Sequence, residues 1–175
     1  MYKNWKPDDN LNFLTNILER GSSIFSFVFA LNETLYYFGA NIFLNNESII
    51  LNYLYTEHII ELQTFQETYE YIIFGTMIFL FTICSTNKIP LTRFIRYNTI
   101  QAILLGVICS CVGSIFMYLP MGFREGIMGA LLTNFLFLLS TGVIIYSSIL
   151  IFFGKFPTIP IISEAARIQI QKSHY

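Results

Sequence analysis

The chain has 175 residues, of which 54% are hydrophobic and only 12% are charged, and its mean hydropathy is +0.57. Soluble domains normally carry about 25% charged residues, so this composition excludes an ordinary soluble protein and predicts an integral membrane protein. The net charge of −1 is uninformative by itself, but the basic residues form small clusters beside apolar segments, and we therefore expect no nucleic-acid partner.

Four apolar segments are candidates for helices that cross a membrane. A transmembrane helix needs about 20 predominantly apolar residues to cross a hydrocarbon core of about 30 Å. The predicted spans lie at about residues 22–44, 69–86, 97–119 and 126–153. With an N-terminal tail, 1–21, and a C-terminal tail, 154–175, they make up a single all-α membrane domain of residues 1–175.

The segment between the first two spans, Asn45–Thr68, is acidic and contains no Lys or Arg. Its apolar residues recur at the spacing of one helical face, at Ile59, Leu62, Phe65 and Tyr69. Carboxylates occupy the rest of this segment and the boundary that follows it, at Glu57, Glu61, Glu67 and Glu70. We expect an acidic amphipathic helix that lies on the membrane or against a partner; a merely solvated acidic loop is the alternative.

The basic residues are distributed unevenly between the two sides of the predicted spans. Nine of the ten fall in the two tails and in the loop between the second and third spans: Lys3, Lys6, Arg20, Lys88, Arg93, Arg96, Lys155, Arg167 and Lys172. Only Arg124 falls on the opposite side. Because basic residues stay on the cytoplasm-like side of a membrane, both termini are expected there, and the uneven division supports four spans.

Polar residues inside the predicted spans are candidate functional groups. Glu33 lies near the middle of the first span, where a carboxylate costs a few kcal/mol, so it should face a polar interior or be protonated. The amides of Asn32, Asn98, Gln101 and Asn134 are expected to hydrogen-bond between helices, as structural contacts or as part of a polar route.

Small residues recur every four positions in the third span and at the start of the fourth. They are Ala102, Gly106, Ser110 and Ser114, followed by Gly122, Gly126 and Ala130. Such stripes let membrane helices approach closely. They predict that the third and fourth spans pack together as an antiparallel hairpin.

The sequence carries no signature of an enzyme, a metal site or a cofactor site. Both histidines, His58 and His174, fall outside the predicted spans. The cysteines Cys84, Cys109 and Cys111 lie in apolar runs, and the last two point to different faces of a helix, so all three are interpreted as packing residues.

Two motifs carry a resemblance to a known family. RFIRYNTIQAILL, beginning at Arg93, is similar to the signature R-F-x-R-[FY]-N-x-x-Q-A-[IV]-L-L of the twenty-kilodalton subunit family of the chloroplast inner-envelope protein translocon (Tic complex). FPTIPIISEAARIQ, beginning at Phe156, resembles the P-x-[IL]-P-[IL]-I-S-[DE]-A-A run that closes the same family. The chain departs from the family at Gly106, where an aspartate is often expected.

The resemblance implies a subunit of the preprotein translocon in the plastid inner envelope, with four spans and both termini in the stroma. It implies other translocon subunits, transit peptides and membrane lipids as partners. The motif residues assigned to a stromal mouth are Arg93, Arg96, Asn98 and Gln101, and those of the closing motif are Pro157, Pro160, Ser163 and Glu164. Glu33 and Asn134 are assigned to a polar path, and the four carboxylates Glu57, Glu61, Glu67 and Glu70 to a loop that attracts Arg-rich, acidic-poor transit peptides.

The sequence also bears on where the chain is made. The tail MYKNWKPDDNLNF mixes charges and includes Asp8 and Asp9, so we expect no cleavable presequence. The abundance of Ile, Phe, Tyr and Asn is typical of AT-rich organelle genomes, which favours a plastid-encoded algal member of the family. Two alternatives remain: a non-conducting structural or assembly subunit of a larger membrane complex, and a pigment- or lipid-binding protein with four spans.

Overall fold

A computed structural model of the chain describes residues 13–40, 42, 53, 57, 60–86 and 90–172, and this part is all-helical. The elements are α1 (Phe13–Thr34), a π-helical turn η1 (Leu35–Gly39), α4 (Ile60–Ser85), α5 (Arg93–Met117), α6 (Met121–Arg124), α7 (Ile127–Phe152) and α8 (Ile162–Lys172). Three of them, α4, α5 and α7, are long and apolar enough to cross a membrane. They overlap the second, third and fourth predicted spans.

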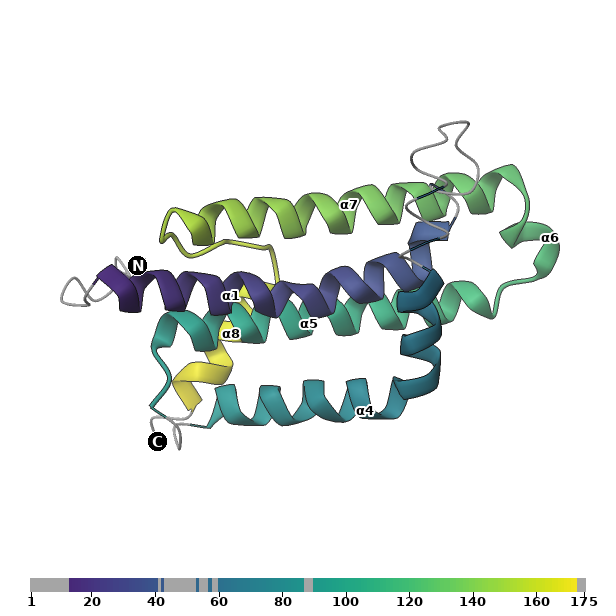
Figure 1. The fold of residues 1–175 in the computed structure, drawn as a ribbon. Helices are drawn as coiled ribbons and strands as arrows, with labels where there is room; N and C mark the ends of the chain where they lie inside the picture. The colour runs from purple at the N-terminus through teal and green to yellow at the C-terminus, as the bar shows by residue number, and fades with distance from the viewer. Residues whose placement is uncertain are drawn as a thin grey trace.

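The four long helices lie side by side, with α1 between α5 and α7 and with α4 against the other side of α5 (Figure 1). Helices α1 and α5 run parallel, because the contacts of Ser26 with Thr99 and of Glu33 with Ser110 advance together along both. Helix α7 runs in the opposite direction, since Arg20 near the start of α1 reaches its last turn.

The prediction that the third and fourth spans pack on each other was wrong about the partner. The small residues of α5 face α1: a Cβ at Gly106 would lie 3.5 Å from the Cα of Ala30, and one at Gly113 would overlap the ring of Tyr37. Spacing indicates that a neighbour can approach closely, but it does not identify that neighbour. Here the neighbours are the first helix with its continuation η1 and, at Gly106, the side chain of Met77 on α4.

Helix α4 bends at Tyr69, whose backbone (φ −116°, ψ 22°) is not helical. The turns before this residue run across the end of the bundle, and the turns after it run alongside α5 (Figure 1). The second predicted span began at the same residue. Most of the predicted loop Asn45–Thr68 lies outside the described residues, but 60–68 are helical and continuous with the span.

Arginines close the carboxyl ends of three helices. Arg20 Nη1 donates to Phe152 O of α7 at 2.9 Å, Arg96 Nε to Cys84 O of α4 at 2.7 Å, and Arg124 Nη1 to Met117 O of α5 at 2.9 Å. The last carbonyls of a helix have no partner within it and carry partial negative charge, so a guanidinium stabilises them. These basic residues therefore have a structural use besides the orienting role that the sequence predicts for them.

Helix α8 lies across the end of the bundle at which α1 and α5 begin; we call this the terminal end, and the opposite one the α6 end (Figure 1). Its buried residues Ile162, Ala166 and Ile170 share one face, and it packs mainly on α5. The chain leaves α7 through Gly154, whose φ of +70° suits glycine and lets the amides of residues 154 and 155 bond the carbonyls of Ile151 and Leu150.

Candidate functional site

The two sequence motifs meet at the terminal end, where α5 begins. Gln101 Nε2 donates to Ser163 Oγ at 2.6 Å and also approaches Pro157 O at 3.3 Å. Ser163 Oγ in turn accepts the backbone N–H of Ile159 at 2.6 Å. We call this set of contacts between α5 and residues 156–163 the motif junction.

Aromatic side chains surround the motif junction. The ring of Phe156 lies edge-on to Phe94 and Tyr97, with centroids 5.0 and 5.3 Å apart. Tyr97 is itself buried and donates its hydroxyl hydrogen to Pro157 O at 3.2 Å. A proline carbonyl thus accepts from three side chains, since Ser163 Oγ also donates to it at 3.4 Å.

The four residues assigned to a stromal mouth do not share one environment. Arg93 is exposed, whereas Arg96 is 2% exposed and is bonded to the end of α4. Asn98 and Gln101 are fully buried, and neither amide atom of Asn98 has a hydrogen-bond partner among the described residues. Three of the four therefore lie within helix contacts rather than along an open surface.

Glu33 is buried at the other half of the bundle and is held by a chain of hydrogen bonds. Asn32 Nδ2 donates to Gln66 Oε1 at 2.6 Å, and Gln66 Nε2 donates to Glu33 Oε1 at 3.1 Å. Ser110 Oγ donates to the other carboxylate oxygen at 2.5 Å. The carboxylate of α1 is thus fixed between α4 and α5, in the polar interior expected for it.

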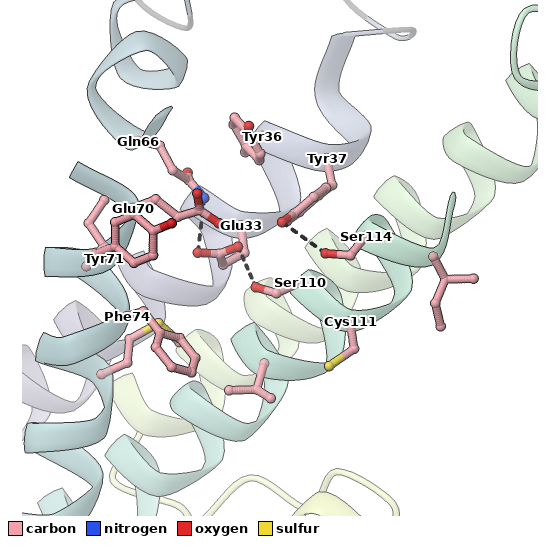
Figure 2. A pocket seen from close by; sticks show the side chains of 14 residues that line it. Glu33, Tyr36, Tyr37, Gln66, Glu70, Tyr71, Phe74, Ser110, Cys111 and Ser114 are labelled. Atoms are coloured by element: carbon pink, nitrogen blue, oxygen red, sulfur yellow. Dashed lines mark hydrogen bonds between the residues drawn. The ribbon is translucent and has the colours of Figure 1, made fainter. Parts of the chain in front are cut away.

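A groove of about 560 Å³ opens beside this carboxylate, beneath the bend of α4. It is lined from α1 and η1 by Glu33, Tyr36 and Tyr37, from α4 by Gln66, Glu70, Tyr71, Ile73, Phe74 and Met77, and from α5 by Val107, Ser110, Cys111, Ser114 and Ile115. Figure 2 shows Glu33 at its centre, with Ser110 and Gln66 pointing toward it and Tyr37 bonded to Ser114 at 3.3 Å. We call it the Glu33 groove.

The remaining candidates are placed as follows. The carboxylates Glu57, Glu61, Glu67 and Glu70 are all exposed, and Glu70 lines the Glu33 groove. Asn134, on α7, is partly buried and does not line this groove, so the structure does not join it to Glu33. In the closing motif Pro157 and Ser163 are buried, whereas Pro160 and Glu164 are exposed.

The sequence analysis did not identify several residues of the groove, although it had singled out the segments that contain them. Gln66 belongs to the predicted amphipathic helix, and Ser110 and Ser114 belong to the small-residue stripe. A polar residue within a stripe of small ones was the available signal, because it can donate to a neighbouring helix. Within the described ranges, no group of His, Cys, Asp or Glu is arranged to hold a metal ion.

Comparison with known proteins places this architecture in a family. Residues 18–166 match the family model described as "Chloroplast import apparatus Tic20-like". The chain is 35% identical over 172 residues to "Tic20 family protein Ycf60" of Gracilaria tenuistipitata var. liui, across 97% of this chain and 81% of that protein. For the protein of the same name in Pyropia yezoensis the identity is 34% over 119 residues, across 67% and 59%. A "Tic20 family protein" of Synechocystis sp. is 31% identical over 131 residues, across 74% and 80%.

Proposed function

The chain belongs to the Tic20-like family of the chloroplast import apparatus, and we propose on this premise that it is a multi-pass subunit of the preprotein translocon in the plastid inner envelope. Its algal relatives named Ycf60 agree with the expectation of a plastid-encoded algal member. The partners in this proposal are other translocon subunits, transit peptides and the surrounding lipids.

The proposal includes four spans, with α1 as the first. Helix α1 carries Glu19, Arg20 and Glu33 and is less apolar than α4, α5 and α7. It nevertheless packs between α5 and α7, and its Ser26 bonds Thr99 of α5 at 2.8 Å. Neighbouring helices that cross the bilayer would stabilise α1 in a transmembrane position, because they shield its polar groups from lipid.

The orientation follows from charge. Arg20, Arg93, Lys155 and Arg167 belong to the terminal end, and Arg124 belongs to the α6 end. By the positive-inside rule the terminal end would face the stroma, and the α6 end the intermembrane space. Both termini would then be stromal.

The burial of the motif residues is the observation that supports the proposed role as a wall or scaffold subunit. Because Arg96, Asn98 and Gln101 are engaged inside the bundle, one copy offers no open polar route along them. We therefore assign the chain to the wall or scaffold of a protein-conducting path that is completed by partner subunits or further copies. A non-conducting assembly subunit is the second candidate, and the same burial favours it equally.

The exposed carboxylates of α4 distinguish the two candidates. Glu61, Glu67 and Glu70 lie on the turns around the bend at Tyr69, on the proposed intermembrane side. Transit peptides are rich in Arg and poor in acidic residues, so this surface would attract them electrostatically in a salt-dependent manner. A wall subunit needs such contact with the precursor, whereas an assembly subunit does not.

The experiment is site-directed cross-linking to a precursor arrested in transit. A photoreactive probe at position 67 tests the acidic surface, and a probe at position 98 tests the bundle interior. We expect adducts from position 67 that weaken with salt. The charge reversal of Glu61, Glu67 and Glu70 to Lys is tested with the probe at position 63 instead, and we expect it to weaken the adducts formed there. The matched control replaces the same three residues by Asp, which keeps the charge. Adducts only with fixed membrane subunits would support the assembly role and contradict contact with the path.

A further inference from the structure

We propose that the Glu33 groove is a binding site for a bilayer lipid whose head is uncharged and rich in hydroxyl groups, such as a glycolipid. The proposal concerns a ligand of the chain itself and does not depend on a role in protein transport. It is carried by four features of the groove: its fixed carboxylate, its charge, its apolar wall and its opening.

The floor of the groove is an oriented hydrogen-bond acceptor. Glu33 accepts one bond at each carboxylate oxygen, from Gln66 and Ser110, and these two bonds hold it in place. A carboxyl group has more hydrogen-bonding positions than these two bonds occupy, whether or not it is ionised. The remaining positions are available to a ligand, and their direction is set before any ligand arrives.

The charge of the groove lining determines which lipid headgroup the groove can accept. Glu33 and Glu70 both line the groove, and the described residues of its lining include no Lys or Arg. Carboxylates repel the phosphate of an anionic phospholipid. Hydroxyl groups donate to carboxylates without bringing a negative charge, and the hydroxyls of Tyr36 and Tyr71 can donate or accept in return.

The rest of the wall suits an acyl chain. Ile73, Phe74, Met77, Val107 and Ile115 are apolar and lie on the two facing helices, α4 and α5. Phe74 is 56% exposed and Ile115 66%, so this wall continues onto the outer surface of the bundle. The volume of about 560 Å³ falls within the range of about 300–1,000 Å³ that is usual for small-molecule sites.

The groove ends where α4 returns to the bundle, and this favours a lipid over a translocating polypeptide. Met77 is buried, and its Cε would lie 3.2 Å from a Cβ at Gly106, so α4 and α5 are in close contact there. A threaded chain needs a route that continues past this point. A lipid enters sideways from the bilayer and needs only the opening between the helices.

The test is native mass spectrometry of the full chain released from nanodiscs that contain equal parts of monogalactosyl diacylglycerol, phosphatidylcholine and phosphatidylglycerol. We expect selective retention of the galactolipid, and its loss in Val107→Trp, which fills the groove. Glu70→Lys should shift retention toward phosphatidylglycerol, because it places a cation in the lining. Glu67→Lys is the matched control: it makes the same charge change on the same helix but does not line the groove.

A second readout does not depend on survival of the complex in the spectrometer. Cys111 lines the groove and is exposed, whereas Cys84 and Cys109 are buried. Galactolipid should slow maleimide labelling of Cys111 several-fold relative to a cysteine introduced at exposed Ile127. Equal retention of all three lipids, preference for phosphatidylglycerol in the unmodified chain, or protection of Cys111 by a basic peptide but not by galactolipid would each overturn the proposal. Because neither assay involves import, these failures leave the transport role untouched.

Discussion

The side-chain amide of Gln101 lies 2.6 Å from the hydroxyl of Ser163, across 62 residues of sequence. This bond joins the start of α5 to the segment that leads into α8. Both residues were singled out in separate motifs, and the structure places the motifs in one contact. The motif junction therefore fixes the C-terminal segment to the membrane bundle. Both motifs contribute to this one contact, so a single structural role explains both.

Breaking this bond should release α8. Ser163→Ala removes the acceptor of the Ile159 N–H and leaves Gln101 Nε2 only its longer contact with Pro157 O at 3.3 Å, and an unsatisfied buried group costs about 1–3 kcal/mol. We expect faster proteolysis of the C-terminal segment in detergent and a lower free energy of unfolding. Gln101→Leu should have a similar effect, and the double variant should cost less than the sum, because the two residues share one interaction. Gln169→Leu on α8 is the control, and equal proteolysis of all variants would contradict the assignment.

The two arginines of the first motif should differ in their tolerance of lysine. Arg96 donates through Nε to Cys84 O and through Nη2 to Ser85 O at 3.4 Å, a geometry that a single ammonium cannot reproduce. Arg93 is exposed, and lysine there preserves its charge. We expect Arg96→Lys to lower stability by about 1–3 kcal/mol and Arg93→Lys to have little effect, as measured by chemical unfolding in detergent. If Arg93→Lys alone impaired precursor import at unchanged stability, the exposed guanidinium would have a role in docking or gating.

Local patterns predicted the helices well, and the reasons are physical. The apolar runs of α5 and α7 are long, and a chain in lipid must satisfy its backbone within each segment, so such runs have few alternatives to helix. The opposite faces of Cys109 and Cys111 were also predicted, since the first is buried and the second exposed. Both conclusions need only the sequence near the residue concerned.

The partners of each helix were less predictable. The stripe at Gly106 indicated close approach, but only the folded chain shows that α1 occupies the place. The Glu33 groove was missed for the same reason, because Gln66 and Ser110 come from different helices and the groove opens where α4 bends at Tyr69. No proline in the sequence marks this bend. A site that is assembled from three segments can be predicted only when the tertiary arrangement of those segments is known.

A side chain at Gly113 should separate α1 from α5. Its Cβ would overlap Cγ of Tyr37, far inside van der Waals contact. Overpacking of this kind costs about 1–3 kcal/mol, so Gly113→Ala should lower the melting temperature in detergent. Gly142→Ala is the matched control, because nothing lies within 4 Å of its Cβ and alanine favours the helix. If the two variants melted alike, the close packing of α1 on α5 would be wrong.

Cysteine labelling in sealed inner-envelope vesicles should decide the number of spans. In a chain whose native cysteines are replaced, single cysteines at Gly21, Gly122 and Thr158 report on the start of α1, on α6 and on the segment after α7; all three positions are exposed. With four spans, a membrane-impermeant maleimide should label positions 21 and 158 from one side and position 122 only from the other. If α1 did not cross the membrane, position 21 would react together with position 122, because α4, α5 and α7 alone place their two ends on opposite sides. Labelling of the first and third positions from the stromal side would also establish the orientation that the basic residues predict.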